Sequence, residues 1–368
     1  MTKILILGGT GYTGKPLARL LLQHSEASIT LAARHLEKAQ ALADEFNHQF
    51  PGGRTSAVYA DAADGNSLQA AFQDQDLILV ASPTTAQAEA VTNAALEVGA
   101  DYLDVQLGAR KFALLQALSA KVSDSGRCFI TEAGFHPGLP AALVRYAASC
   151  MDTLTSANVI SFLNVGSSFP YTEAMDELVE MFKGYQAQVY KAGSWTRRSS
   201  FSVRQFDLGG DIGKKQCYSM FFEELQALPE MHPSLQELGS YISESHWVTD
   251  WILYPFIWAW LMVMPRAVRP IGRLTWWGMK TFHHPPYRVE MQVQAGGLKA
   301  GKPVRLTAAA SHPDGYMLTA VPVAAALLQY LDGSARKPGL WMMGHLCEPV
   351  RLLADMARMG VRVTTSIE

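Results

Sequence analysis

A glycine-rich segment near the N-terminus has the residue types and spacing of a dinucleotide-binding loop. The apolar run Lys3–Leu7 is followed by GGTGYTG, in which Gly9, Gly11 and Gly14 match G-x-G-x-x-G. Such glycines permit a tight turn after a strand, let backbone N–H groups reach a pyrophosphate, and let the next helix lie close to the strand. The N-terminus of that helix supplies further N–H donors. The predicted cofactor-binding residues of this loop are Gly8, Gly9, Thr10, Gly11, Tyr12, Thr13 and Gly14.

Two alternatives exist for this loop. Gly9–Lys15 also fits the P-loop pattern G-x-x-x-x-G-K, but Pro16 stands where a P-loop needs a Ser or Thr hydroxyl for magnesium. The other alternative is a glycine-rich turn that binds no ligand. The dinucleotide interpretation is favoured because the strands that follow in the sequence also fit it.

The ends of the next predicted strands carry residues that could select and hold the cofactor. Ile29–Ala33 ends at Arg34, and an arginine at this place accommodates the 2′-phosphate of NADP, whereas NAD enzymes usually carry an acidic residue. Asp61 follows the third strand and could contact the adenine side or simply be a helix N-cap or turn residue. Ser82 and Pro83 follow the fourth strand and should lie near the pyrophosphate. A solvated Arg34 is the alternative to the NADP prediction.

Candidate catalytic residues are few. His136, just past the sixth predicted strand, has the pKa range for proton transfer coupled to hydride transfer, although it could equally fix a hinge turn. Asp104 and Glu132, at strand ends on the same side, are weaker candidates. No tyrosine has a lysine four residues later, which argues against a Tyr-x-x-x-Lys mechanism. The adjacent pair His283-His284 is interpreted as loop histidines, so no metal site is predicted.

These residues require an α/β fold. Six short buried strands alternate with helices up to Thr131, which predicts a Rossmann doubly wound parallel sheet in the order 3-2-1-4-5-6. From about Leu139 the alternation stops, and runs with strand composition predict a second α+β domain on a mainly antiparallel sheet, with a helix at Tyr171–Ala192. The predicted domains are 1–138 for dinucleotide binding, 139–316 for substrate or dimerisation, and 317–368 as a segment that returns to the first domain.

Composition and charge narrow the class of protein. The 368 residues carry a net charge of −2, so nothing favours nucleic acid as a partner. The four cysteines are widely spaced and form no C-x-x-C, which suits a reducing, cytoplasmic location. The N-terminal apolar run is too short for a signal peptide.

The stretch Trp247–Met264 is unusually apolar and is followed by basic residues and further tryptophans up to Lys280. At 18 residues, interrupted by Asp250 and Pro255, it is marginal for a membrane span. Three alternatives remain: a buried helix, a homodimer contact, or contact of residues 247–280 with a membrane surface or a lipid-like substrate.

Several motifs in order resemble the saccharopine dehydrogenase-like NADP-binding family. They are GGTGYTG at Gly8–Gly14, LAAR at Leu31–Arg34, YLDV at Tyr102–Val105 and EAGFHPGLP at Glu132–Pro140, with a similar closing helix and loop at Leu318–Gly339. The resemblance covers residues 1–150 and implies a Rossmann fold and NADP. The family includes saccharopine reductases, polyamine enzymes and lipid-linked enoyl reductases, so it leaves the substrate open.

Two functions therefore compete. The first is an NADP(H)-dependent oxidoreductase that transfers a hydride to or from a small-molecule or lipid-like substrate. The second is a non-catalytic NADP-binding scaffold or sensor at a membrane or in a complex.

Overall fold

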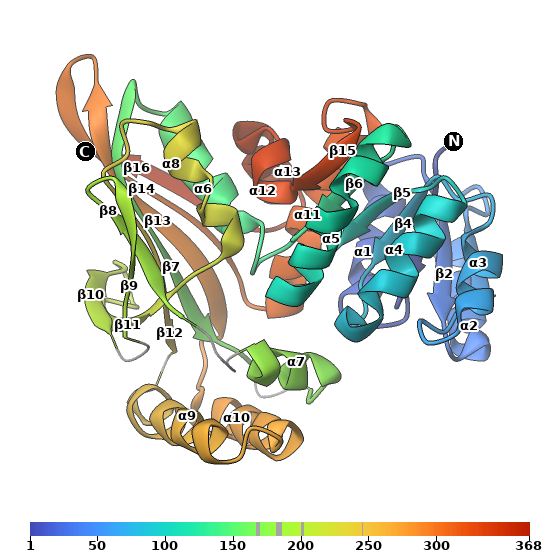
Figure 1. Ribbon diagram of the computed structural model, residues 1–368, viewed down its shortest axis with the longest axis horizontal. Helices are drawn as coiled ribbons and strands as arrows, with labels where there is room; N and C mark the ends of the chain where they lie inside the picture. The colour runs from blue at the N-terminus through green and yellow to red at the C-terminus, as the bar shows by residue number, and fades with distance from the viewer. Residues whose placement is uncertain (167–169, 182–185, 200–201, 245) are drawn as a thin grey trace. The chain divides into compact units, whose positions relative to one another are not determined.

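The computed structural model describes residues 1–166, 170–181, 186–199, 202–244 and 246–368 (Figure 1). The chain divides into two compact units. The first comprises Met1–Ala142 and Tyr316–Met359, and the second comprises Leu143–Gly315 and Gly360–Glu368. The predicted segment 317–368 returns to the first unit only as far as Met359, because the last nine residues pair with the sheet of the second unit.

The first unit is built on a parallel sheet. Its strands are β1 (Lys3–Leu7), β2 (Ser28–Ala33), β3 (Thr55–Tyr59), β4 (Leu77–Val80), β5 (Asp101–Asp104), β6 (Cys128–Thr131) and β15 (Gly339–Met342). Within the described residues these seven strands have the order β15-β6-β5-β4-β1-β2-β3, and all neighbours run parallel. The predicted 3-2-1-4-5-6 order is confirmed, and β15 adds an unpredicted seventh strand beside β6.

Helices of the first unit connect and cover these strands. They are α1 (Gly14–His24), α2 (Leu36–Gln49), α3 (Gly65–Phe72), α4 (Ala88–Glu97), α5 (Ala109–Asp124), α11 (Gly315–Leu331), α12 (Met343–Leu346) and α13 (Pro349–Arg358), with α6 (Leu139–Ser149) at the boundary between the units. Helices α3, α4 and α5 pack side by side over one face of the sheet. Ile4, Leu5 and Ile6 of β1 are inaccessible to solvent, as expected for a central strand that is covered on both faces.

The C-terminal part of the first unit is anchored to the sheet through one carboxylate. Asp101, at the start of β5, accepts hydrogen bonds from Tyr330 Oη at 2.7 Å and from Arg336 Nε at 2.8 Å. Its other oxygen accepts the backbone N–H of Cys128 in β6 at 2.9 Å. These contacts fix the end of α11, and with it the approach of the chain to β15.

The second unit is built on a larger sheet. Its strands are β7 (Thr153–Asn164), β8 (Gln188–Lys191), β9 (Ser194–Arg197), β10 (Val203–Asp207), β11 (Lys214–Met220), β12 (Glu237–Glu244), β13 (Arg288–Lys299), β14 (Lys302–His312) and β16 (Arg362–Ile367). In the described part of this unit the main order is β10-β11-β12-β7-β13-β14-β16, with β8 paired to β12 and to β9. Neighbours are antiparallel except β12 and β7, so the predicted mainly antiparallel sheet is confirmed.

Helices of the second unit differ from the prediction in one place. They are α7 (Glu173–Met181), α8 (Leu228–Met231), α9 (Tyr254–Val263) and α10 (Val268–Phe282). The predicted helix Tyr171–Ala192 is wrong at its end, because Gln188–Lys191 forms β8; residues 182–185 lie outside the described residues. Pairing with β12 and β9 outweighs the local helical pattern there.

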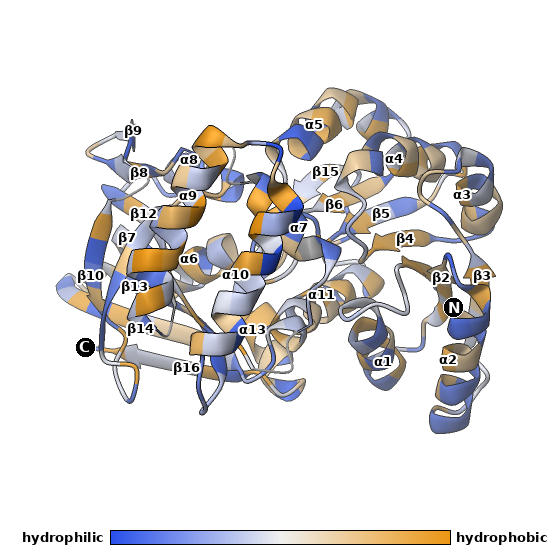
Figure 2. Ribbon diagram, turned by 90° about the horizontal axis from the view of Figure 1, so that it is seen from below, coloured by the Kyte–Doolittle hydropathy of each residue, from blue (hydrophilic) through white to orange (hydrophobic). Residues whose placement is uncertain are grey.

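The chain between β12 and β13 forms the helices α9 and α10, and the apolar stretch Trp247–Met264 contains α9. A π-helical turn, Thr249–Leu253, precedes α9, and Pro255 lies in the first turn of α9, where the missing N–H costs little. No helix among the described residues is long and apolar enough to cross a membrane. Figure 2 shows strongly hydrophobic bands along α9 and a mixed pattern on α10.

Candidate functional site

The loop between β1 and α1 is held by backbone hydrogen bonds. The N–H of Gly8 donates to Ala32 O at 2.9 Å, and the N–H of Gly11 donates to Gly8 O at 2.9 Å. Gly8 has a φ of +86°, a left-handed conformation that residues with a Cβ rarely adopt. The loop therefore turns sharply at the carboxyl end of β1, next to β2.

Gly14 brings the start of α1 against this turn. A Cβ atom at Gly14 would overlap the carbonyl oxygen of Gly8, so only glycine fits. No hydrogen bond from the backbone N–H of Tyr12 or Thr13 occurs within the described part of the chain, and Thr13 caps α1 without its side chain. The first turn of α1 thus keeps N–H donors available for an anion.

The loop after β4 lies against the glycine loop. A Cβ at Gly8 would lie 2.8 Å from Ser82 Cβ. Gln106, a buried residue that the sequence analysis did not single out, donates from Nε2 to Ser82 O at 2.8 Å and to Thr84 Oγ1 at 3.0 Å. Pro83 is exposed in the same loop. Strand order therefore brings Gly8 and Ser82 together at the point between β1 and β4, where doubly wound sheets bind nucleotides.

The two predicted adenine-side residues differ in their surroundings. Arg34 is exposed after β2, and the described residues give its guanidinium no hydrogen bond or ion pair. Asp61 uses Oδ1 to accept the N–H of Ala63 at 3.0 Å, and Ser67 Oγ donates to the Asp61 carbonyl at 3.1 Å. Arg34 is therefore available to a 2′-phosphate, whereas the contacts of Asp61 favour its turn role.

An aromatic pair lies beside the glycine loop. The ring of Tyr12, more than half exposed, stacks on Tyr316 of α11 with centroids 5.2 Å apart and an interplanar angle of 23°. Tyr316 lies more than 300 residues away in the sequence, so no local pattern pointed to it. The pair links the returning C-terminal segment to the predicted cofactor loop.

Asp104 lies in a fully buried polar cluster. Its Oδ1 is 2.6 Å from Lys111 Nζ, and its Oδ2 accepts Thr131 Oγ1 at 2.8 Å. Lys111 also donates to Gln106 O at 2.6 Å and Thr131 Oγ1 at 2.7 Å. Both charged side chains are completely inaccessible to solvent. This environment favours a structural role for Asp104, which ties β5, β6 and α5 together.

His136 and Glu132 occupy a tight turn after β6. Glu132 is completely buried and has a φ of +54°, a left-handed conformation that side chains rarely adopt. Burial lowers the pKa of His136 to about 3, so its imidazole is neutral near pH 7. A ring with so low a pKa is a weak proton acceptor at neutral pH, which favours positioning over general-base catalysis. The Phe135 and His136 rings pack with centroids 4.1 Å apart.

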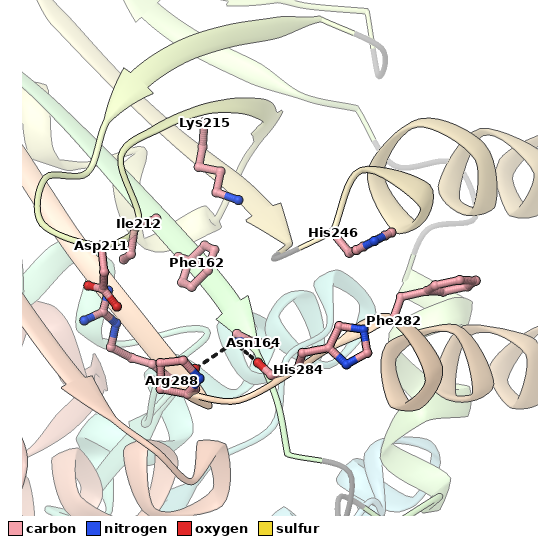
Figure 3. Close-up of a pocket in the computed structure, with 10 residues that line it drawn as sticks. Phe162, Asn164, Asp211, Ile212, Lys215, His246, Phe282, His284 and Arg288 are labelled. Atoms are coloured by element: carbon pink, nitrogen blue, oxygen red, sulfur yellow. Dashed lines mark hydrogen bonds and ion pairs between the residues drawn. The ribbon is translucent and has the colours of Figure 1, made fainter.

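A pocket of about 220 Å³ lies within the second unit, between the strand ends and the chain that leaves α10 (Figure 3). Arg288 donates to Asp211 Oδ1 at 2.9 Å, and Asn164 Nδ2 donates to the carbonyls of His284 and Pro286 at 2.9 Å each. Asn164 Oδ1 is buried and has no hydrogen-bond partner among the described residues. Lys215 and Asp211 also line the pocket, so its wall carries side chains of both charges.

Other polar residues of the second unit make structural contacts. His283 is buried and its Nδ1 accepts the N–H of Val165 at 3.0 Å, which fixes the chain after α10. Arg204 pairs with Glu237 Oε1 at 2.5 Å. Asp250 is buried, and its backbone carbonyl accepts a hydrogen bond from Tyr218 Oη.

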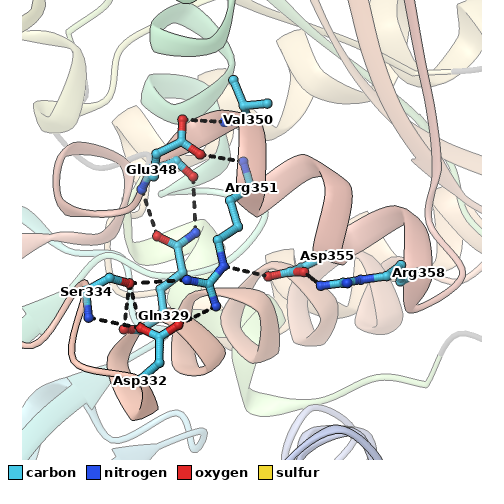
Figure 4. A network of polar contacts seen from close by, with 8 residues as sticks. All are labelled: Gln329, Asp332, Ser334, Glu348, Val350, Arg351, Asp355 and Arg358. Carbon is cyan, nitrogen blue, oxygen red and sulfur yellow. Dashed lines mark hydrogen bonds and ion pairs between the residues drawn. The ribbon is translucent and has the colours of Figure 1, made fainter.

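A polar network at the C-terminal end of the first unit also has a structural explanation (Figure 4). Glu348 accepts the N–H groups of Val350 and Arg351 and so caps α13. Arg351 reaches Asp332 Oδ2 at 2.5 Å and Asp355 Oδ2 at 3.5 Å. The network joins the end of α11 to α13 through ion pairs of Arg351 with Asp332 and Asp355.

Comparisons with known proteins agree with this geometry. Residues 4–127 match the family described as saccharopine dehydrogenase NADP binding domain. Over 178 residues the chain is 26% identical to saccharopine dehydrogenase [NADP(+), L-glutamate-forming] of Saccharomyces cerevisiae, covering 48% of this chain and 37% of that protein. It is 40% identical over 103 residues to an N-acetyl-gamma-glutamyl-phosphate reductase of Psychrobacter arcticus, 27% of each chain. The chain thus spans well under half the length of these curated relatives.

A solved structure extends the likeness beyond the first unit. The apo saccharopine dehydrogenase (L-Glu forming) from Saccharomyces cerevisiae superposes with a TM-score of 0.70 over 100% of both chains, at 15% sequence identity. At this identity the match shows the fold and not the substrate. Residues 4–127 are therefore similar to the saccharopine dehydrogenase NADP-binding domain, and the chain as a whole shares the fold of the yeast enzyme.

Proposed function

We propose that this protein is an NADP(H)-dependent oxidoreductase that transfers a hydride to or from a small-molecule or lipid-like substrate. The observation that carries the proposal is the glycine loop at the switch between β1 and β4, with α1 N–H donors on one side and the loop of Ser82 on the other. This is the place and the donor set that a dinucleotide pyrophosphate requires.

The choice of NADP is supported by Arg34. Its guanidinium is exposed at the end of β2 and makes no ion pair within the described ranges. In this position a guanidinium donates hydrogen bonds to a 2′-phosphate in a charge-assisted contact. When bound, the cofactor supplies the hydride, and the residues of this chain bind and orient it.

A second candidate is a non-catalytic NADP-binding sensor or scaffold. One observation favours it: neither predicted catalytic residue is poised as a proton donor, because Asp104 is tied to Lys111 and the His136 ring is neutral near pH 7.

One experiment tests the first candidate against the second. NADPH and NADH binding are titrated first, and NADPH oxidation is then followed with imines, keto acids and enoyl lipids, with Gly11→Val as the binding-deficient control. Turnover by the wild type that the control lacks supports an oxidoreductase. Tight NADPH binding without turnover across all three substrate classes supports the sensor, and an absence of any dinucleotide binding contradicts both.

A further inference from the structure

The helices after β12 expose an unusual amount of apolar surface. Of the sixteen large hydrophobic side chains that are exposed among the described residues, eight lie between Trp247 and Trp277. We call this set the exposed apolar face: Trp247, Trp251, Ile252, Phe256, Met262, Val263, Met264 and Trp277. Their exposed fractions run from 49% for Trp251 to 80% for Val263.

This surface is not a poorly packed core. Leu253, Ile257 and Leu261 repeat every four residues, and they pack inward with Val179 of α7 and Ile271 of α10. The inward-facing apolar side chains of the two helices are therefore already buried. A helix at the surface of a water-soluble unit normally carries polar residues on its other face, but α9 is apolar there too.

The charged residues around the exposed apolar face indicate which kind of surface would cover it. From 247 to 282 the sequence has one acidic residue, Asp250, which is buried, and four basic residues, Arg266, Arg269, Arg273 and Lys280, which are exposed. Lys280 Nζ lies 5.0 Å from the ring centroid of Trp276, so cation and aromatic ring are adjacent. An apolar face bordered by basic and tryptophan side chains matches the interface of a bilayer with anionic headgroups.

We propose that the α9–α10 hairpin docks on the surface of an anionic lipid bilayer, with the exposed apolar face inserted at the headgroup level. A span is excluded by length, because the 10 residues of α9 reach only about 15 Å, half of a hydrocarbon core of about 30 Å. A second copy fits less well, because a two-fold contact places the same patch on both sides and so brings like charges together.

Co-sedimentation of the full chain with vesicles tests the proposal. The vesicles contain phosphatidylcholine alone or with phosphatidylserine. The wild type should bind the phosphatidylserine vesicles more tightly. The triple variant Ile252→Ser, Phe256→Ser, Met262→Ser should bind them about a hundredfold more weakly. The double variant Arg266→Glu, Arg269→Glu should bind these vesicles about thirtyfold more weakly or worse. Added salt should weaken the binding of the wild type to them.

Matched controls come from exposed residues elsewhere in the chain. The triple variant Tyr59→Ser, Met231→Ser, Val350→Ser and the double variant Lys38→Glu, Arg110→Glu should bind vesicles as the wild type does. Circular dichroism checks that each variant is folded. Six of the eight tryptophans lie between 247 and 277, so quenching by brominated lipid chains gives a second measurement.

The results that contradict the proposal are distinct. A wild type that ignores both kinds of vesicle overturns it, and so does a folded apolar-face variant that binds as well as the wild type. Light scattering on the same samples tests the alternative, in which two copies of the chain pack through this face. A dimer that the triple substitution dissociates, without vesicle binding, would assign the face to a second copy of the chain.

Discussion

The Nζ atom of Lys111 lies 2.6 Å from Oδ1 of Asp104, and neither side chain has any contact with solvent. A buried charge that loses its partner is costly, typically by ~3–5 kcal/mol, whereas removing both charges costs much less. The pair joins α5 to β5 in the sheet that carries the glycine loop. Its contribution should therefore appear in the stability of the first unit.

Lys111→Met should lower the free energy of unfolding by about 3–5 kcal/mol. The double variant Asp104→Asn, Lys111→Met should recover part of this loss, because no unpaired charge remains. Chemical denaturation measures both, with the exposed residue Lys38→Met as the control. Should Lys111→Met unfold like the wild type, the pair does not carry the structural role that its burial indicates.

Arg34→Ala should weaken NADP(H) binding about 10- to 100-fold, because a charge-assisted contact contributes ~1.5–3 kcal/mol. The affinity for NAD(H) should remain the same, since NAD lacks the 2′-phosphate. Titration of both cofactors gives the ratio, and Arg110→Ala on α5 serves as an exposed control. An unchanged NADP affinity in Arg34→Ala would show that this arginine is merely solvated.

Substitutions at Gly11 and Gly14 should separate binding from folding. A Cβ at Gly11 meets only Gly8 O, at 3.1 Å, so Gly11→Val should fold but lose cofactor binding by more than about a hundredfold. A Cβ at Gly14 overlaps Gly8 O, so Gly14→Ala should destabilise the protein itself by about 1–3 kcal/mol. Thermal unfolding and NADPH titration of the two variants check both halves. Normal NADPH affinity in Gly11→Val would refute the dinucleotide site.

Burial of His136 should make stability depend on pH. Its pKa is about 3 in the folded protein and near 6.5 when unfolded, so between these values only the unfolded chain binds the proton. The contribution is fully present above about pH 6.5 and declines as pH falls towards 3. His136→Gln should therefore lose less stability than the wild type between pH 7 and pH 5, while the exposed residue His24→Gln should match the wild type. Chemical denaturation at several pH values measures this. If the free energy of unfolding changes with pH in the same way for His136→Gln and wild type, the low pKa of His136 is contradicted.

The order of the first six strands could be predicted because each signal is local. Buried apolar runs such as Leu77–Val80 mark central strands, and the right-handed crossover rule limits how they connect. The glycine loop and Arg34 follow from the same logic, since their positions relative to β1 and β2 are set by a few residues.

Features that depend on distant pairing could not be predicted. Arg362–Ile367 has strand composition, but no local property of it selects β14 of the second sheet over an edge of the first. Gln188–Lys191 is a strand only because β12 and β9 lie beside it. Lys111 looks like an ordinary surface lysine of an amphipathic helix, and its burial follows from the position of Asp104 in the folded sheet. In each case the fold of the sheet, rather than the composition of the segment, brings the deciding partner alongside.

The two ends of the α9–α10 hairpin lie close together at the second sheet. The chain leaves β12 at Glu244, which pairs with Leu163, and enters β13 at Arg288, which pairs with Asn164. Both points therefore flank the end of β7, roughly 10 Å apart at ordinary strand spacing.

At the base of the hairpin, the ring of His246 stacks on that of Phe282 with centroids 5.3 Å apart. The hairpin is thus an insertion between two strands of one continuous sheet. Residues 247–281 could be exchanged for a linker of about four glycines and serines, which spans such a gap. Val179→Ser would make polar the part of α7 that the deletion exposes. The shortened chain should then retain both sheets. One deletion would thus separate the proposed attachment to a membrane surface from dinucleotide binding.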